Sequence, residues 1–147
     1  MTALILLAAG MAAQDNPIPR STTVIVQGVK VELKRCEKVA TKSISCSLVI
    51  TNLQADRLIA LQAGNGPHSF FVDSGGMEVH ANHVQLGSVN GGGGGARTET
   101  VTDTPVRGSV DFGVGDPRAT SLAKLSIGLH TDQGFRVEFR KVPLESN

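Results

Sequence analysis

The chain contains two cysteines, Cys36 and Cys46, and they stand at the facing ends of two runs with β-strand character, residues 29–33 and 44–50. A short polar stretch separates the two runs. Opposed residues of an antiparallel pair lie about 4.5 to 5.5 Å apart at Cα, within the roughly 4.4 to 6.8 Å that a disulfide spans. We therefore expect a hairpin closed by a Cys36–Cys46 disulfide, an antiparallel β architecture and an oxidising compartment.

Alternation of apolar and polar residues predicts the strands around this hairpin. In the run 44–50 every second residue is apolar, so Cys46 should face the core. Residues 106–114 and 135–140 alternate in the same way. Residues 122–129 also fit one face of a helix, and we favour a strand because the neighbouring segments are β. Strand signals at intervals of roughly ten residues predict an antiparallel β-sandwich of about seven or eight strands.

Glycine marks the turns of this chain. The 17 glycines exceed the usual share of about 7%. Asn90 precedes five consecutive glycines, which have no side chains to pack, so we expect a flexible loop at 90–96 inside one domain at 22–144. The sequence Asp-Ser-Gly-Gly at 73–76 has the composition of a tight hairpin turn.

Several of these segments occur in an order and spacing typical of one family. They are Val29-x-Val31-x-Leu33-x-x-Cys36, Cys46-x-Leu48-x-Ile50-Thr51-Asn52, Asp56-Arg57, Asp73-Ser-x-Gly76, Val106-x-Gly108-Ser-Val110-x-Phe112, Ala119-Thr-Ser-Leu122 and Phe135-x-Val137-x-Phe139-Arg140-x-Val142-Pro143-Leu144. Together they resemble immunoglobulin-like β-sandwich domains of unknown function found in exported bacterial proteins. The resemblance implies a sandwich fold and a periplasmic or secreted location, and it carries over no catalytic residues. The glycine run departs from the pattern as a local insertion.

The first residues resemble the end of a secretory signal. Residues 2–9 are apolar, and small residues precede Gln14, so we predict a signal peptide at 1–13 and a leader at 14–21. The segment is atypical because no Lys or Arg precedes the apolar run, and a first core strand or helix is the alternative. A membrane span needs about 20 apolar residues, so we expect none here.

Composition argues against several classes of partner. The 14 basic and 13 acidic residues give a net charge of +1, and no run concentrates Lys or Arg, so we expect no nucleic-acid partner. The chain has five Phe and neither Tyr nor Trp, which disfavours carbohydrate and single-strand binding, because both usually use exposed aromatic rings. Arginine is the main remaining residue type that commonly dominates protein interfaces.

Two constellations could carry chemistry. The turn 73–76 echoes the sequence around the nucleophile of trypsin-like serine proteases, but the only preceding histidine, His68, is six residues before Ser74. Met77, His80 and His83 offer thioether and imidazole ligands for copper or zinc. On a regular strand His80 and His83 face opposite sides, so a bend at 81–82 is needed to gather them.

The sequence therefore predicts an exported, non-enzymatic binding or accessory module without a cofactor, whose partner is another protein or an envelope component. A periplasmic metal-binding protein that uses Met77, His80 and His83 is the alternative. An enzyme with an unfamiliar site is a third reading, and no nucleophile, base and orienting group recur close together to favour it.

Overall fold

The structure is a computed structural model that describes residues 22–39, 43–64 and 66–146. The predicted signal peptide and leader lie outside these residues. Within them the chain forms strands and no helix, so the all-β prediction is confirmed. The strands are β1 (Thr23–Val26), β2 (Val29–Lys38), β3 (Ser43–Asn52), β4 (Arg57–Gln62), β5 (Phe70–Asp73), β6 (Glu78–Leu86), β7 (Val89–Gly92), β8 (Gly95–Thr100), β9 (Pro105–Gly113), β10 (Ser121–His130) and β11 (Gly134–Ser146).

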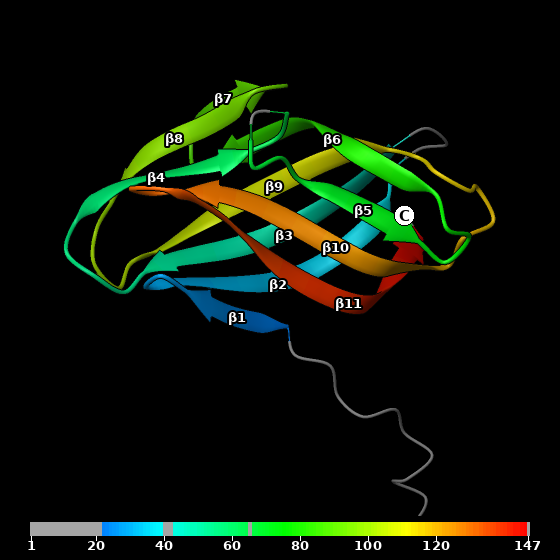
Figure 1. The fold of residues 1–147 in the computed structure, drawn as a ribbon, viewed down its shortest axis with the longest axis horizontal. Helices are drawn as coiled ribbons and strands as arrows, with labels where there is room; N and C mark the ends of the chain where they lie inside the picture. The colour runs from blue at the N-terminus through cyan, green and yellow to red at the C-terminus, as the bar shows by residue number, and fades with distance from the viewer. Residues whose placement is uncertain (1–21, 40–42, 65, 147) are drawn as a thin grey trace, which may run out of the picture.

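Seven of these strands close into a barrel (Figure 1), in the order β2, β3, β9, β6, β5, β10, β11 and back to β2. All neighbours in this ring are antiparallel except β11 and β2, which pair in parallel at Leu144–Cys36, Glu145–Glu37 and Ser146–Lys38. Four further strands extend the sheet: β1 pairs with β2, β7 with β6, and β4 with both β10 and β8. The predicted immunoglobulin-like sandwich is therefore wrong, because the two sheets of a sandwich do not join into a closed ring.

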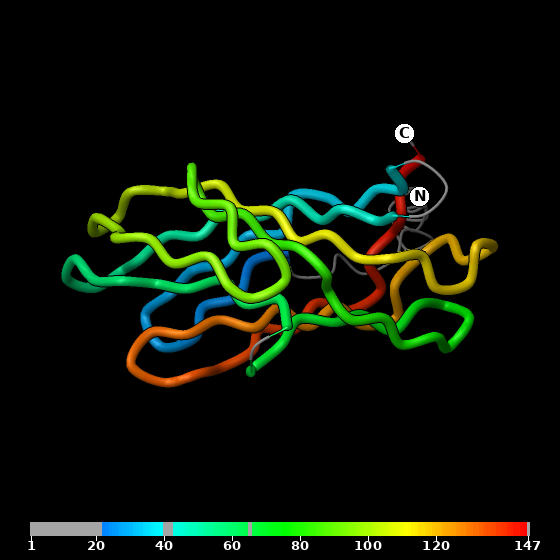
Figure 2. Tube along the Cα trace, turned by 90° about the horizontal axis from the view of Figure 1, so that it is seen from above, coloured from blue at the N-terminus to red at the C-terminus, as the bar shows by residue number. Residues whose placement is uncertain are grey.

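Two strands close the ring because each pairs with both walls of the barrel. Residues 78–80 of β6 pair with β5, and residues 81–86 pair with β9 after a register shift between Ala81 and His83. β11 likewise pairs with β10 as far as Pro143 and then joins β2. We call β2, β3, β9 and residues 81–86 the first wall, and β5, β10, β11 and residues 78–80 the second wall. Figure 2 shows the two walls as two layers that face each other.

The core lies between the two walls, and alternation places its side chains. On β3 the fully or almost fully buried apolar residues are Ile44, Cys46, Leu48 and Ile50, which is the face predicted from the sequence. Cys36 and Cys46 form the expected disulfide, and both are 0% exposed. Phe71 of the second wall meets Phe112 of the first wall edge to face, with ring centroids 5.0 Å apart. The barrel is therefore filled by side chains.

The glycine run is mostly strand, in contrast to the predicted flexible loop at 90–96. β7 ends at Gly92 and β8 begins at Gly95, so only Gly93 and Gly94 of the run lie outside strands. A Cβ on Gly91 would stand 2.5 Å from the backbone carbon of Gly95, closer than real Cβ contacts. At this position glycine is required because two backbones approach closely.

Candidate binding groove

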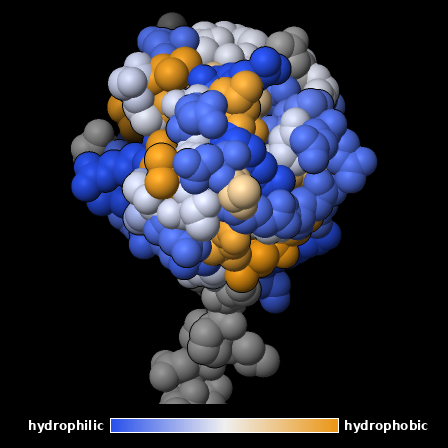
Figure 3. Space-filling model, turned by 90° about the vertical axis from the view of Figure 1, so that its left-hand side faces the viewer, coloured by the Kyte–Doolittle hydropathy of each residue, from blue (hydrophilic) through white to orange (hydrophobic). Residues whose placement is uncertain are grey.

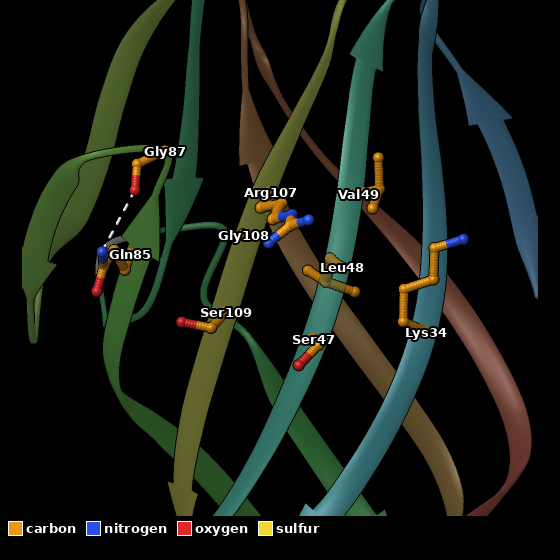
Figure 4. Close-up of a pocket in the computed structure, with 9 residues that line it drawn as sticks. All are labelled: Lys34, Ser47, Leu48, Val49, Gln85, Gly87, Arg107, Gly108 and Ser109. Atoms are coloured by element: carbon orange, nitrogen blue, oxygen red, sulfur yellow. Dashed lines mark hydrogen bonds between the residues drawn. The ribbon is translucent and has the colours of Figure 1, made fainter.

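A groove of about 630 Å³ crosses the outer face of the first wall. Figure 4 shows its lining residues on β2, β3, β9 and β6 and in the turn after β6. They are Lys34, Ser47, Leu48, Val49, Gln85, Gly87, Arg107, Gly108 and Ser109. The groove is open to solvent along the wall.

Small side chains on adjacent strands create this groove. Ser47 of β3 lies in register with Ser109 of β9, which lies in register with Gln85 of β6. Period-2 alternation turns Ser47 and Ser109 outward while their neighbours Leu48 and Val110 are buried. Because the serine side chains are short, the surface of the first wall is hollowed where they lie side by side.

Arg107 is the unpaired charge of the groove. In Figure 4 its guanidinium lies between β9 and β3. Its side chain makes no ion pair or hydrogen bond with the residues that the structure describes. Lys34 also lines the groove, but its amine points away from Arg107 and lies 3.4 Å from a carboxylate oxygen of Glu32. No carboxylate lines the groove, so its electrostatic character is positive.

The polar groups beside Arg107 are also available to a ligand. The hydroxyls of Ser47 and Ser109 have no hydrogen-bond partner in the described part of the chain. The Gln85 amide donates to the carbonyl of Gly87 at 3.3 Å and keeps its oxygen free of described donors. A guanidinium next to hydroxyls suits a carboxylate or another oxyanion, because both can donate charge-assisted hydrogen bonds to it.

The predicted metal ligands have separate surroundings. The Nε2 of His80 lies 2.9 Å from an oxygen of Glu78, and its ring stacks on His68. His83 lies 2.8 Å from the Asn90 amide oxygen through Nε2 and 3.2 Å from Asp111 through Nδ1.

β6 is irregular between Ala81 and His83, where a bend was needed for His80 and His83 to face the same side. The register shift at 81–83 leaves Ala81 and Val84 buried and turns both histidines outward. Met77 is 51% exposed at the start of β6. Among the described residues no three of the types His, Cys, Asp and Glu gather as a metal site, so nothing here adds to the metal-binding alternative.

The turn 73–76 is a hairpin between β5 and β6, as predicted. Asp73 is 2% exposed, and its carboxylate accepts hydrogen bonds from the backbone N–H groups of Gly75 and Met77 at 2.9 Å and of Asp116 at 2.7 Å. His68 stacks on His80 and makes no hydrogen bond with Ser74 in the described chain. The carboxylate therefore has a structural role, which joins this hairpin to the loop before β10.

Sequence reasoning placed Arg107 and Ser109 on the outer face of a half-buried strand but did not single them out. Their alternation with Val110 and Phe112 was the available signal. The missing information was that β3 lies beside β9, because only this pairing aligns Ser47 with Ser109. The local alternation of residues shows which way a side chain points, but it does not show which residue lies beside it on the next strand.

Comparison of the sequence with models of known protein families and with curated proteins finds no match. In the described part of the chain, no helix has the length and apolar character needed to cross a membrane. The disulfide is consistent with an oxidising compartment.

At the end of the molecule that Figure 3 shows, hydrophobic residues form several groups separated by hydrophilic ones, with a broad group at the lower edge. The exposed large apolar residues of the described chain are Ile25, Leu53, Leu58, Met77 and Val101.

Proposed function

We propose that the protein is an exported, non-enzymatic binding module, located in the periplasm or secreted, that holds an acidic segment of a partner protein in the groove of the first wall. The observation that carries this proposal is the unpaired guanidinium of Arg107 in a groove that no carboxylate lines. A carboxylate of the partner would supply the missing ion pair. The buried disulfide supports the compartment.

The shape of the groove favours an extended segment over a small molecule. Small-molecule sites usually enclose most of the ligand surface, whereas this groove is open along its length. The free hydroxyls of Ser47 and Ser109 and the oxygen of Gln85 can bond the backbone of an extended chain. Arg107 then selects for an acidic side chain, since charge complementarity sets specificity more than affinity.

Reversal of the charge at Arg107 tests the proposal. Two labelled peptides of equal length, one alternating Asp with Ser and one alternating Lys with Ser, are titrated against the wild-type protein and Arg107→Glu by fluorescence anisotropy. We expect the wild type to prefer the acidic peptide, and Arg107→Glu to bind it at least about tenfold more weakly, since a charge-assisted hydrogen bond contributes roughly 1.5 to 3 kcal/mol.

Arg97→Glu is the matched control. Arg97 is an exposed arginine of β8 whose side chain has no ion pair in the described chain, and it does not line the groove. Arg97→Glu changes the net charge by the same amount as Arg107→Glu. Because Arg97 lies outside the groove, we expect this variant to bind the acidic peptide about as well as the wild type. Equal loss in the two variants, or no preference for the acidic peptide, would contradict the proposal.

A further inference from the structure

Three aromatic rings gather on the outer face of the second wall, away from the groove. The ring of His68, in the loop before β5, stacks on His80 of β6 with centroids 4.4 Å apart and planes inclined by 14°. Phe70 of β5 lies 5.5 Å from His68 and 6.0 Å from His80. Phe70 and His80 are partners in the β5–β6 register, so the backbone sets this cluster.

Two cations flank the rings. The amine of Lys124 on β10 lies 5.2 Å from the centroid of Phe70, and the guanidinium carbon of Arg136 on β11 lies 5.8 Å from it. Arg136 is also held in place, because its Nε donates a hydrogen bond of 3.2 Å to the backbone oxygen of His68. Arg136 therefore stays close to the imidazole of His68, and Lys124 lies over Phe70.

Two acidic groups lie near the cluster, and each already has a partner. Glu78 of β6 pairs with His80 at 2.9 Å, and Glu138 of β11 pairs with Arg140 at 3.2 Å and with Lys124 at 3.9 Å. Neither His68 nor Arg136 forms an ion pair within the described residues. The imidazole of His68 and the neighbouring guanidinium of Arg136 therefore have no acidic partner in the described chain.

Protonation of the histidines would increase the excess of positive charge in the cluster. The Nη2 of Arg136 lies 3.5 Å from Nδ1 of His68, a geometry that suits a neutral imidazole as acceptor. Burial, and after it the neighbouring His80 and Arg136, lowers the pKa of His68 below its ordinary value, and the opposite effect of Glu78 does not cancel this. A proton on each stacked ring would place like charges face to face beside Arg136.

We propose that this cluster is a second binding site, which takes up an oxyanion, a sulfate- or phosphate-like group or a carboxylate, together with protons on His68 and His80. The anion lies against His68 and Arg136, which have no acidic partner in the described chain, and adds negative charge beyond that of Glu78, which pairs with His80, and Glu138. Lys124, Arg136 and Arg140 exceed these two acids by one charge, and protonation of both histidines raises the excess to three. The site does not depend on the groove of the first wall.

Linkage provides the test, because an anion that prefers the protonated site must raise the titration midpoint of its histidine. The Cε1 proton of His68 is followed by NMR from pH 8 to pH 5 in sodium chloride and in sodium sulfate at equal ionic strength. Sulfate keeps its double charge over this range. A parallel series with sodium acetate distinguishes a tetrahedral anion from a carboxylate, and a response to either supports the site.

We expect sulfate to raise the midpoint of His68 by at least about 0.5 pH units, which corresponds to roughly threefold tighter binding by the protonated form. Arg136→Gln should abolish this response. Arg140→Gln is the matched control, since Arg140 lies on the same face of β11 and already pairs with Glu138, and it should keep the response, as should Arg107→Glu. The resonances of His83 and His130 serve as internal references.

Three results would overturn the proposal. The first is a His68 midpoint that is the same in chloride, sulfate and acetate. The second is an equal response of all four histidines, which indicates a general salt effect. The third is a full response in Arg136→Gln.

Discussion

At the scale of single residues, one buried carboxylate organises an end of the barrel. Asp73 accepts three backbone N–H groups, two from its own hairpin and one from Asp116 in the loop between β9 and β10. Its side chain has no cationic partner in the described part of the chain. Backbone donors alone therefore compensate for the loss of hydration.

We expect Asp73→Ala to destabilise the protein by about 3 kcal/mol, because it leaves buried backbone donors without an acceptor. Urea denaturation followed by circular dichroism measures this change. Ser74→Ala, in the exposed part of the same turn, is the control and should change the stability by less than about 0.5 kcal/mol. Equal stability of Asp73→Ala and the wild type would show that solvent satisfies these donors.

The lowered pKa of His68 predicts a pH dependence of stability in chloride buffer. The unfolded chain, with a histidine near 6.5, binds the proton more readily than the folded one. Stability is therefore fully present above that value and decreases as the pH falls through it, until the pH is below the folded pKa. We expect a lower urea midpoint at pH 5 than at pH 7.5, and a smaller difference in His68→Gln.

Two acidic residues with a lowered pKa, Asp56 and Asp116, do not disturb this measurement. A backbone hydrogen bond from Thr102 lowers the pKa of Asp56, and one from Arg118 lowers the pKa of Asp116. Their stabilising effect is present above the ordinary value of 3.8 and is lost only at lower pH. An unchanged pH dependence in His68→Gln, with His130→Gln as control, would assign the effect to another group.

At the scale of elements, the sequence predicts strands well and their partners poorly. Alternation identifies the buried face of β3 and the cysteine hairpin, because both depend on residues close in the chain. The groove depends on β3 lying beside β9, about sixty residues away, so its residues show only as ordinary outward positions. The sequence predicts a loop where the structure has the ends of β7 and β8, because a flexible linker and a close backbone approach favour the same residue.

The glycine run offers a test with a matched pair. A Cβ on Gly91 would meet the backbone of Gly95 and Ala96 at 2.5 and 2.6 Å, whereas a Cβ on Gly93 would meet only an ordinary contact, the Asn82 oxygen at 3.5 Å. We expect Gly91→Ala to cost roughly 1 to 3 kcal/mol and Gly93→Ala less than about 0.5 kcal/mol in thermal denaturation. Equal tolerance of both would support the flexible loop that the sequence suggested.

At the scale of the whole molecule, the barrel is closed by a short parallel seam. β1 and β11 share one edge of β2, where β1 pairs with residues 29–32 and β11 with residues 36–38. No local sequence pattern shows that β1 and β11 both pair with β2. The residues of β11 that pair with β2 directly continue the part of the strand that pairs with β10. A strand count therefore could not distinguish a sandwich from a closed barrel.

The disulfide lies at this seam, since Cys36 is in register with both Cys46 and Leu144. For a sequence separation of 10, the chain-entropy model predicts that loss of the bond costs about 2.5 to 3 kcal/mol. We expect the Cys36→Ala/Cys46→Ala variant to lose at least this much in urea denaturation, because it also loses buried side-chain volume. Wild-type protein refolded under reducing conditions isolates the bond, because it keeps both sulfur atoms.

The place where the reduced protein loses protection from hydrogen exchange shows whether the disulfide stabilises the β11–β2 pairing or the whole fold. If the disulfide holds the strand that closes the barrel, hydrogen exchange in the reduced protein should accelerate most at the amides of Leu144, Glu145 and Ser146 and least where β10 pairs with β5. The seam has only three residue pairs, so it can open without disturbing the second wall. Uniform acceleration across all strands would instead mean that the bond acts only by limiting the unfolded chain.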